Sequence, residues 1–156
     1  MTSPAVAGLG VPGPDHSPVV PEIVDLANEL VGRIWAHFAA RAAELNLSAA
    51  EAKALSHLEA DQPMPMRALA ARLHANPSNV TVIVARLEAR GLLERQVSDD
   101  RRVKGVRLTP DGLELRRKLQ ARLIADHPAV RGLLPTDQDT LLSLLRRLID
   151  HNIRQK

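Results

Sequence analysis

The amino-acid sequence predicts a mainly α-helical fold with one small β-hairpin. After Pro21, apolar residues recur at steps of three and four along most of the chain, which is the repeat of a helix with one buried face. Two short strand-like segments flank a polar turn between residues 92 and 108. The chain has one Trp, one Phe and no Tyr, so its core must consist of Leu, Val, Ile and Ala, which suits packed helices. From 156 residues we expect one domain.

The composition excludes several kinds of chemistry. The absence of Cys excludes disulfides, thiolate catalysis, thiol redox sensing and zinc bound by Cys. The sequence has no HExxH, P-loop, GxGxxG or GxSxG motif, and no two of its six His lie within five positions of each other. We therefore expect no enzyme, no cofactor and no helical pair of His ligands, while a metal site assembled from distant residues stays open.

Signals for export and for membrane insertion are also missing from the sequence. No Lys or Arg precedes Arg33, so the basic start of a signal peptide is lacking. No apolar run approaches the roughly 18 residues that a membrane span needs. We expect a cytoplasmic protein without a membrane partner.

Positive charge is concentrated in one segment. The chain has a formal net charge of +3 and a sequence pI of about 9.9. Between Arg67 and Arg107 lie nine basic and four acidic residues, a net charge of +5, so the rest of the chain sums to −2. Charge focused in this way attracts nucleic-acid phosphates. The alternative is an Arg-rich surface that is only solvated.

The first half of the chain predicts an arm, a long helix and then a shorter one. Residues 1–20 are rich in Pro and Gly and predict a disordered arm. A helical repeat then extends from Pro21 to about Leu45. A second helix begins with a capping box in which Ser48 caps the amide three residues on and Glu51 reaches back.

Two closely spaced helices follow. The second helix is expected to end near Ala60, because two prolines come soon after it. The sequence MRALAARL predicts a short helix from Met66 to about Leu73. A turn of three residues, 74–76, separates this helix from the next segment.

That next segment, residues 76–91, gives conflicting signals. Five consecutive β-branched residues, 80–84, favour a strand. However, Asn76 and Pro77 are typical of a helix start, and Gly91 is typical of a helix end. One helical face would carry Val80, Ile83, Val84 and Leu87. The β-branched run costs a helix about 1–2 kcal/mol, whereas burying four large apolar side chains contributes several kcal/mol, so we predict a helix.

Together these two helices have the spacing of a helix-turn-helix. The side chains off the apolar face of the second helix are candidates for DNA contact, because the N-terminal half of a recognition helix meets base edges. Ser, Asn and Thr bond to bases or phosphates, a Val methyl meets a thymine methyl, and Arg reaches guanine or phosphate. The candidates are Ser78, Asn79, Thr81, Val82 and Arg86. The alternative for each is simple solvation, with first-turn capping as a further alternative for Ser78.

The remainder predicts a hairpin and two more helices. The strand candidates are 92–97 and 103–108, the second weakened by Gly105. Thr109 and Pro110 begin a helix that extends to about Asp126. The last helix begins near Pro135, and its apolar residues are Leu141, Leu144, Leu145, Leu148 and Ile149.

Two motifs of the central segment resemble those of the MarR family of bacterial transcriptional regulators. The spacing Asp100-x-Arg102, followed by five residues and Leu108-Thr109, resembles the wing signature of that family. The pattern Val80-Thr81…Arg86-Leu87-Glu88-x-x-Gly91-Leu92…Arg95 resembles its recognition helix and the strand that follows. The resemblance covers about residues 21–153, including the order of the helices.

The resemblance implies a winged helix-turn-helix homodimer that binds a palindromic operator, most often as a repressor. Residues 21–46 and 110–153 would form the dimerisation helices, and residues 48–109 the DNA-binding region. In the wing, Arg102 would enter the minor groove, where a narrow groove has enhanced negative potential. Asp100 would orient the wing by pairing with an Arg, and Arg101 and Lys104 would contact phosphate.

The sequence departs from the family pattern at two positions. Many members have a basic residue where this chain has Val82, so a major-groove contact is expected to differ. Gly105 stands where an apolar strand residue is usual, which predicts a more mobile wing.

Family members often bind small aromatic or phenolic anions between the dimer helices and the winged region. Candidates here are aromatic and basic residues, because an Arg and a His beside aromatic rings suit an anionic ring compound. They are Trp35, His37, Phe38 and Arg41 on the first helix and His57 on the second. The alternative is that the aromatic residues belong to a dimer core. For the whole chain, the alternative function is a winged-helix module that binds a protein partner.

Overall fold

The structure is a computed structural model, which describes residues 19–97 and 103–153. Within these residues it contains six helices and one two-stranded antiparallel sheet, which confirms the predicted fold class. The elements are α1 (Val20–Ala43), α2 (Ala49–His57), α3 (Met66–Leu73), α4 (Pro77–Ala89), β1 (Leu93–Val97), β2 (Val103–Leu108), α5 (Pro110–Ile124) and α6 (Pro135–Ile153). No helix among the described residues is long and apolar enough to cross a membrane.

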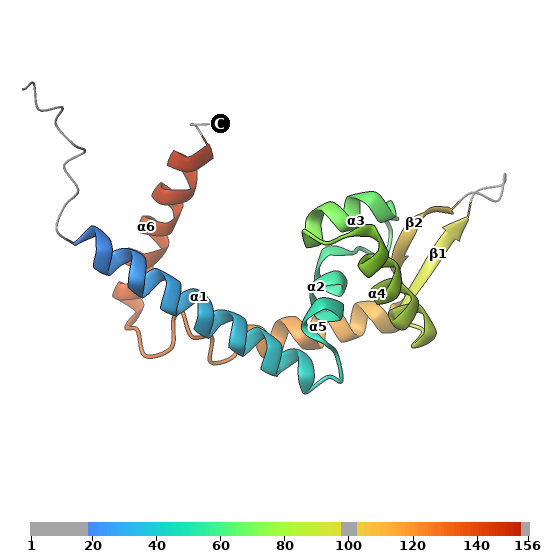
Figure 1. Cartoon of the computed structure of the whole chain (residues 1–156). Coiled ribbons are helices and arrows are strands. Elements are labelled where there is room, and N and C mark those ends of the chain that lie inside the picture. Colours follow the sequence, from blue (N-terminus) through green and yellow to red (C-terminus); the bar gives the residue numbers. More distant parts are fainter. Residues whose placement is uncertain (1–18, 98–102, 154–156) are drawn as a thin grey trace, which may run out of the picture.

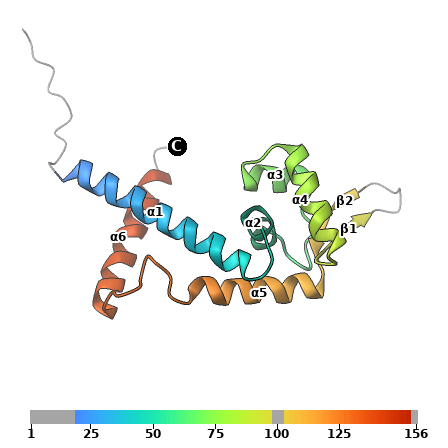
Figure 2. The same cartoon turned by 60° about the horizontal axis from the view of Figure 1, so that its bottom comes forward.

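The elements form two unequal parts. Helices α2, α3 and α4 gather with the hairpin into a compact group at one end of the molecule, and α5 passes beneath this group (Figure 1). We call this group, residues 48–109, the winged region. The long helix α1 extends away from it, and α6 crosses the N-terminal half of α1 in both views (Figures 1 and 2). We call α1 and α6 the terminal helices.

The core of the molecule lies in and under the winged region. Its side chains are aliphatic, as the composition requires, and most come from α2, α3, α4 and β2. The largest fully buried ones are Leu55, Leu58, Leu69, Leu87, Leu108, Leu119, Val80, Val84 and Val106. Each such side chain stabilises the fold by roughly 1.5–3 kcal/mol through burial.

The terminal helices, in contrast, leave large apolar side chains exposed. Along α6 only Leu141 is half-buried, and the other described side chains of the helix are exposed. The exposed apolar residues of these helices are Ile23, Val24, Leu26, Val31, Trp35, Leu142, Leu144, Leu145, Leu148 and Ile149. Much of the surface of these side chains is therefore left uncovered by the described part of the chain.

Within residues 76–91, Pro77–Ala89 form a helix, as the flanking residues and the periodicity predict. Val80, Val84 and Leu87 are fully buried, and Ile83 is partly buried against the same core. The helix ends at Ala89, and Gly91 follows with φ of +69°, the left-handed conformation that glycine adopts at little cost. The β-branched run is thus overridden by packing.

The predicted N-cap residues Ser48, Asn76 and Thr109 all stand at the N-cap position, and the side chains of two of them make the capping bond. The Glu51 amide donates to Ser48 Oγ at 3.2 Å, and the Ser48 amide donates to Glu51 Oε2 at 2.8 Å. At the start of α5, Thr109 Oγ1 accepts from the Gly112 amide at 3.1 Å. Asn76 does precede α4, but its side chain makes no capping bond, so this helix start depends on backbone geometry and on Pro77.

Helix α2 ends at His57, earlier than the predicted Ala60, because the chain turns to join the hairpin. Leu58 has extended backbone angles, and the Leu108 amide donates to the Glu59 carbonyl at 2.9 Å. Met64 then pairs with Val106 through two backbone bonds of 2.8 and 2.9 Å. The α2–α3 connection is therefore held against β2, a contact that the sequence did not predict.

Gly105 has a packing role in this arrangement. A Cβ at this position would lie 2.6 Å from the Met64 carbonyl oxygen, closer than real Cβ atoms approach. Glycine therefore permits the close approach of the α2–α3 connection to β2. The wing tip, whose mobility the sequence predicts, lies outside the described residues.

Candidate nucleic-acid interface

The exposed side of α4 carries all five residues predicted for the recognition helix. Helix α3 packs against α4, and the turn between them passes through His74 in the left-handed conformation, with φ of +52°. Val82 is 51% exposed, although nothing in the packing requires an apolar residue there. The other four candidates, Ser78, Asn79, Thr81 and Arg86, are also exposed. The arrangement therefore presents a surface with hydroxyl, amide, methyl and guanidinium groups.

The hydroxyl of Thr81 already has a partner. Thr81 Oγ1 donates to the Pro77 carbonyl, one turn back along α4, at 3.0 Å. Its lone pairs remain, so in this conformation Thr81 acts as a hydrogen-bond acceptor. A group that Thr81 binds must accordingly donate, as the exocyclic amines of adenine and cytosine do.

Some of the described Arg residues of the basic segment, 67–107, are paired with a carboxylate, and others remain free to bind an anion. Arg95 Nε pairs with Glu88 Oε2 at 3.0 Å, and Arg107 Nε pairs with Glu94 Oε1 at 2.7 Å. Three other Arg residues of α3 and α4 form no ion pair with any described carboxylate: Arg67, Arg72 and Arg86. Among the described side chains of the basic segment, the charge without a carboxylate partner therefore lies mainly on the helix-turn-helix.

The hairpin provides a second projection beside α4 (Figure 1). Strands β1 and β2 pair in antiparallel register from Leu93 with Leu108 to Val97 with Val103, with an irregularity between Gln96 and Val97. The Arg107–Glu94 ion pair crosses between the strands. The proposed tip residues Asp100, Arg101 and Arg102 lie outside the described residues. Lys104 lies in β2, and its side chain is not described.

The hydroxyl of Thr109 joins the helix-turn-helix to the hairpin and α5. Besides capping α5, Thr109 Oγ1 donates to the Gly91 carbonyl at 2.6 Å, and the Thr109 amide donates to the Leu92 carbonyl at 3.1 Å. A Cβ on Gly112 would lie 2.0 Å from that same Leu92 carbonyl, so glycine allows the first turn of α5 to approach it. The end of α4, the start of β1 and the start of α5 thus meet at one point.

The predicted ligand residues fall into two separate groups. On α1, the Trp35 and Phe38 rings stack with centroids 5.4 Å apart, and Trp35 is 53% exposed. Arg41 Nη2 pairs with Glu44 at 2.8 Å, and His37 Nε2 lies 3.2 Å from the Leu123 carbonyl of α5.

The fifth candidate, His57, has its described contacts with α3 instead. The Arg72 side chain donates to the His57 carbonyl at 3.5 Å. Burial lowers the pKa of His57 below 6.5, and the positive charges of Arg72, Lys53 and His74 lower that pKa further. The described neighbours of His57 are therefore basic residues, and His57 does not join the aromatic residues of α1.

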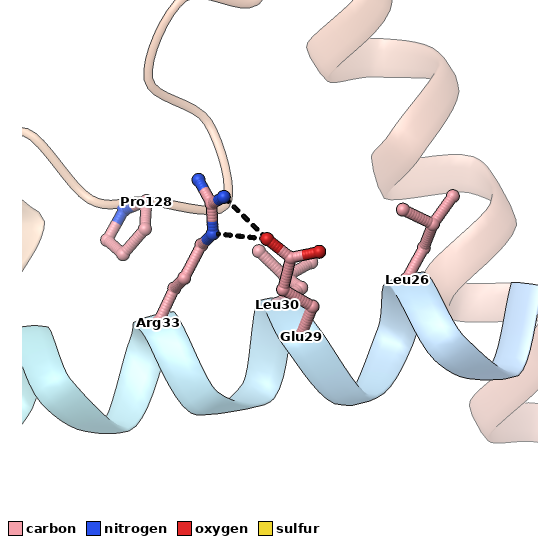
Figure 3. A pocket seen from close by; sticks show the side chains of 5 residues that line it. All are labelled: Leu26, Glu29, Leu30, Arg33 and Pro128. Atoms are coloured by element: carbon pink, nitrogen blue, oxygen red, sulfur yellow. Dashed lines mark hydrogen bonds and ion pairs between the residues drawn. The ribbon is translucent and has the colours of Figure 1, made fainter.

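One hollow of about 380 Å³ was not predicted (Figure 3). Leu26, Glu29, Leu30 and Arg33 line it from α1, and Pro128 faces them from the α5–α6 connection. Arg33 Nε donates to Glu29 Oε1 at 3.0 Å within it. No local pattern joins α1 to Pro128, so only the fold could bring them together. Among the described residues, no group of three His, Asp or Glu gathers as for a metal ion.

Comparison with known proteins agrees with this geometry. Residues 47–104 match the family model described as the MarR family. A transcriptional regulator of the MarR family from Silicibacter pomeroyi is 28% identical, with a TM-score of 0.63, covering 83% of this chain and 88% of that one. No curated protein sequence matches the chain.

Two further solved structures share the fold at lower identity. A MarR family protein of Mycobacterium tuberculosis, in complex with p-aminosalicylic acid, is 21% identical with a TM-score of 0.67, covering 81% of this chain and 97% of that one. CouR from Rhodococcus jostii, bound to p-coumaroyl-CoA, is 24% identical with a TM-score of 0.65, covering 86% and 93%. The helix-turn-helix, the hairpin and the family match of residues 47–104 together support a winged helix-turn-helix transcriptional regulator similar to those of the MarR family.

Proposed function

We propose that this regulator binds a palindromic operator as a homodimer, represses transcription there, and responds to a small aromatic anion. The observation that carries the DNA-binding part is the exposed side of α4, where polar groups lie beside an Arg without a carboxylate partner. Base edges in the major groove suit Ser78, Asn79, Thr81 and Val82, and guanine or phosphate suits Arg86. Such a protein would act in the cytoplasm.

The wing completes the proposed DNA contact. Arg102 would enter the minor groove, Arg101 and Lys104 would contact phosphates, and Asp100 would hold the tip by pairing with an Arg. These assignments follow from the family resemblance and from the position of β1 and β2 beside α4 (Figure 1). A hairpin in that position reaches the groove next to the one that receives α4.

The exposed apolar side chains of the terminal helices support a homodimer. A contiguous apolar patch beyond a few hundred Å² is unusual on a monomer, and a second copy of the chain would cover the same helices on both partners. We propose residues 21–46 and 110–153 as the dimerisation helices and 48–109 as the DNA-binding region. Two-fold symmetry in the protein then requires two symmetric half-sites in the operator.

The proposed effector site lies on α1, where the exposed Trp35 ring stacks on Phe38. Arg41 lies one turn further along the helix and would bind an acidic group of the ligand, with His37 nearby. The complexes of two structural neighbours with p-aminosalicylic acid and p-coumaroyl-CoA support an aromatic ligand. Because α1 is also a dimerisation helix, a ligand there would change the spacing of the recognition helices and hence operator affinity.

Binding to duplex DNA at increasing salt tests the proposal, with Arg86→Gln as the main variant. We expect wild-type affinity to decrease steeply with salt, since each phosphate contact contributes about 0.9 to the log–log slope. Arg86→Gln should weaken binding by about 1–3 kcal/mol. Arg117→Gln is the matched control, because it removes the same charge from an exposed position on α5, away from α4.

Two outcomes would count against this function. Binding that is absent or insensitive to salt would favour the alternative, a winged-helix module for a protein partner. Equal losses in Arg86→Gln and Arg117→Gln would show that only overall charge matters, and that α4 is not the DNA-contacting helix.

A further inference from the structure

A second group of basic side chains lies where α2, α3 and the α3–α4 turn meet. Lys53 and His57 are four residues apart on α2, so they share one face of the helix. Arg72 lies in the last turn of α3 and reaches the His57 carbonyl, and His74 follows in the turn. We call Lys53, His57, Arg72 and His74 the α2–α3 basic cluster.

The cluster has no counter-ion among the described residues. Neither Lys53 nor Arg72 forms an ion pair with a described carboxylate. The two nearest carboxylates along the chain have other partners, since Glu51 accepts from the Ser48 amide and Glu59 pairs with Arg116 of α5 at 3.0 Å.

The charges that act on the His57 ring are accordingly all positive. They come from Lys53 on its own helix, from Arg72 on α3 and from His74 in the turn. Helices α1, α4 and α5 also pack against α2, and none of their described side chains contributes a charge to the ring. The unprotonated ring is therefore favoured, and an anion arriving at the cluster would reverse that preference.

The position of the cluster indicates which kind of anion would bind to it. His74 belongs to the turn that leads directly into α4, four residues before Ser78. In helix-turn-helix proteins the recognition helix enters the major groove, and the elements around it contact the phosphates that border the groove. Figure 1 shows α2 and α3 directly beside α4.

We propose that the α2–α3 basic cluster binds a backbone phosphate of the DNA bordering the groove that receives α4, and that His57 takes up a proton when this phosphate binds. The inference rests on the proposed function, since it assumes that α4 enters the groove. It assigns to His57 a role in DNA binding in place of the effector role predicted from the sequence.

The direction in which DNA affinity changes with pH follows from the pKa of His57 in the free and in the DNA-bound protein. In free protein its pKa is lowered, and a phosphate beside the ring would raise the pKa, so the complex binds more protons than the free protein. DNA affinity should therefore increase as the pH falls from about 8 toward about 6, where imidazole groups titrate. Each pKa unit between free and bound states corresponds to about a tenfold change in affinity.

The test measures affinity for duplex DNA of random sequence across this pH range, for wild type and His57→Gln. We expect the acid-induced gain of wild type to be reduced several-fold in His57→Gln. Titration calorimetry in two buffers of different ionisation enthalpy should show proton uptake by wild type and less uptake by the variant. His16→Gln, before the first helix and outside both the proposed DNA-binding and dimerisation regions, is the matched control and should keep the wild-type pH dependence.

Nuclear magnetic resonance of the His57 ring identifies the source of the phosphate. The inference expects duplex DNA to raise the pKa of His57 and inorganic phosphate to leave it nearly unchanged, because only DNA is held in place by α4. An equal effect of inorganic phosphate would assign the cluster to a free anion and overturn the inference. Identical pH dependence in wild type and His57→Gln would also overturn it, whereas absence of DNA binding at every pH would overturn the proposed function as well.

Discussion

The winged region and the terminal helices differ in where their apolar side chains lie. In the winged region, the Leu and Val residues of α2, α3, α4 and β2 are buried against one another, and polar groups cover the outside. In α6, Leu144, Leu145, Leu148 and Ile149 are exposed, although they follow the same helical repeat. A similar helical repeat therefore builds a closed core in one region and an uncovered surface in the other, because among the described residues only the winged region has elements that cover its apolar faces.

The largest expected effect comes from making the same change in both regions. Leu55→Ala removes a fully buried side chain of α2 and should lower the free energy of unfolding by about 2–5 kcal/mol. Leu144→Ala, on α6, should change it far less when unfolding is measured at protein concentrations low enough to keep the chain monomeric. Denaturant titration measures the free energy of unfolding of both variants. Equal losses would show that Leu144 is as well packed within one chain as Leu55.

Smaller changes in stability are expected from replacing one glycine in each region with alanine. Gly105→Ala places a Cβ 2.6 Å from the Met64 carbonyl, so the α2–α3 connection must move away from β2, at a cost of about 1–3 kcal/mol. Gly32→Ala, in the middle of α1, meets no atom within 4 Å and should instead stabilise the helix by about 1 kcal/mol. The unfolding temperatures of the two variants should therefore shift in opposite directions. A Gly105→Ala variant as stable as wild type would show that this glycine has no packing role.

The features predicted correctly from the sequence depend on residues close together in the chain. The helix at 77–89, the Ser48–Glu51 capping box and the Thr109 cap are all determined within about one or two helical turns. Asn76 shows the limit, because residue type indicates where a helix begins and not whether the side chain makes the capping bond.

The features that were missed depend on contacts between distant residues. The pairing of Met64 with Val106 explains both the early end of α2 and the presence of Gly105, and no local pattern predicts it. The sequence groups His57 with Trp35 because a His beside aromatic rings suits an anionic ring compound. Its surroundings are set by Arg72 and His74, which only the packing of α3 against α2 brings to it.

The number of chains bound to one operator-length DNA duplex directly reports whether the terminal helices join two copies of the protein. Sedimentation of the complex measures this number for wild type and for Leu148→Glu, which places a charge on a side chain of α6 that is 62% exposed in the single chain. We expect two wild-type chains per duplex, and for Leu148→Glu a folded monomer with much weaker DNA binding. One wild-type chain per duplex, or a Leu148→Glu variant that still binds as a dimer, would show that the terminal helices do not join two winged regions on DNA.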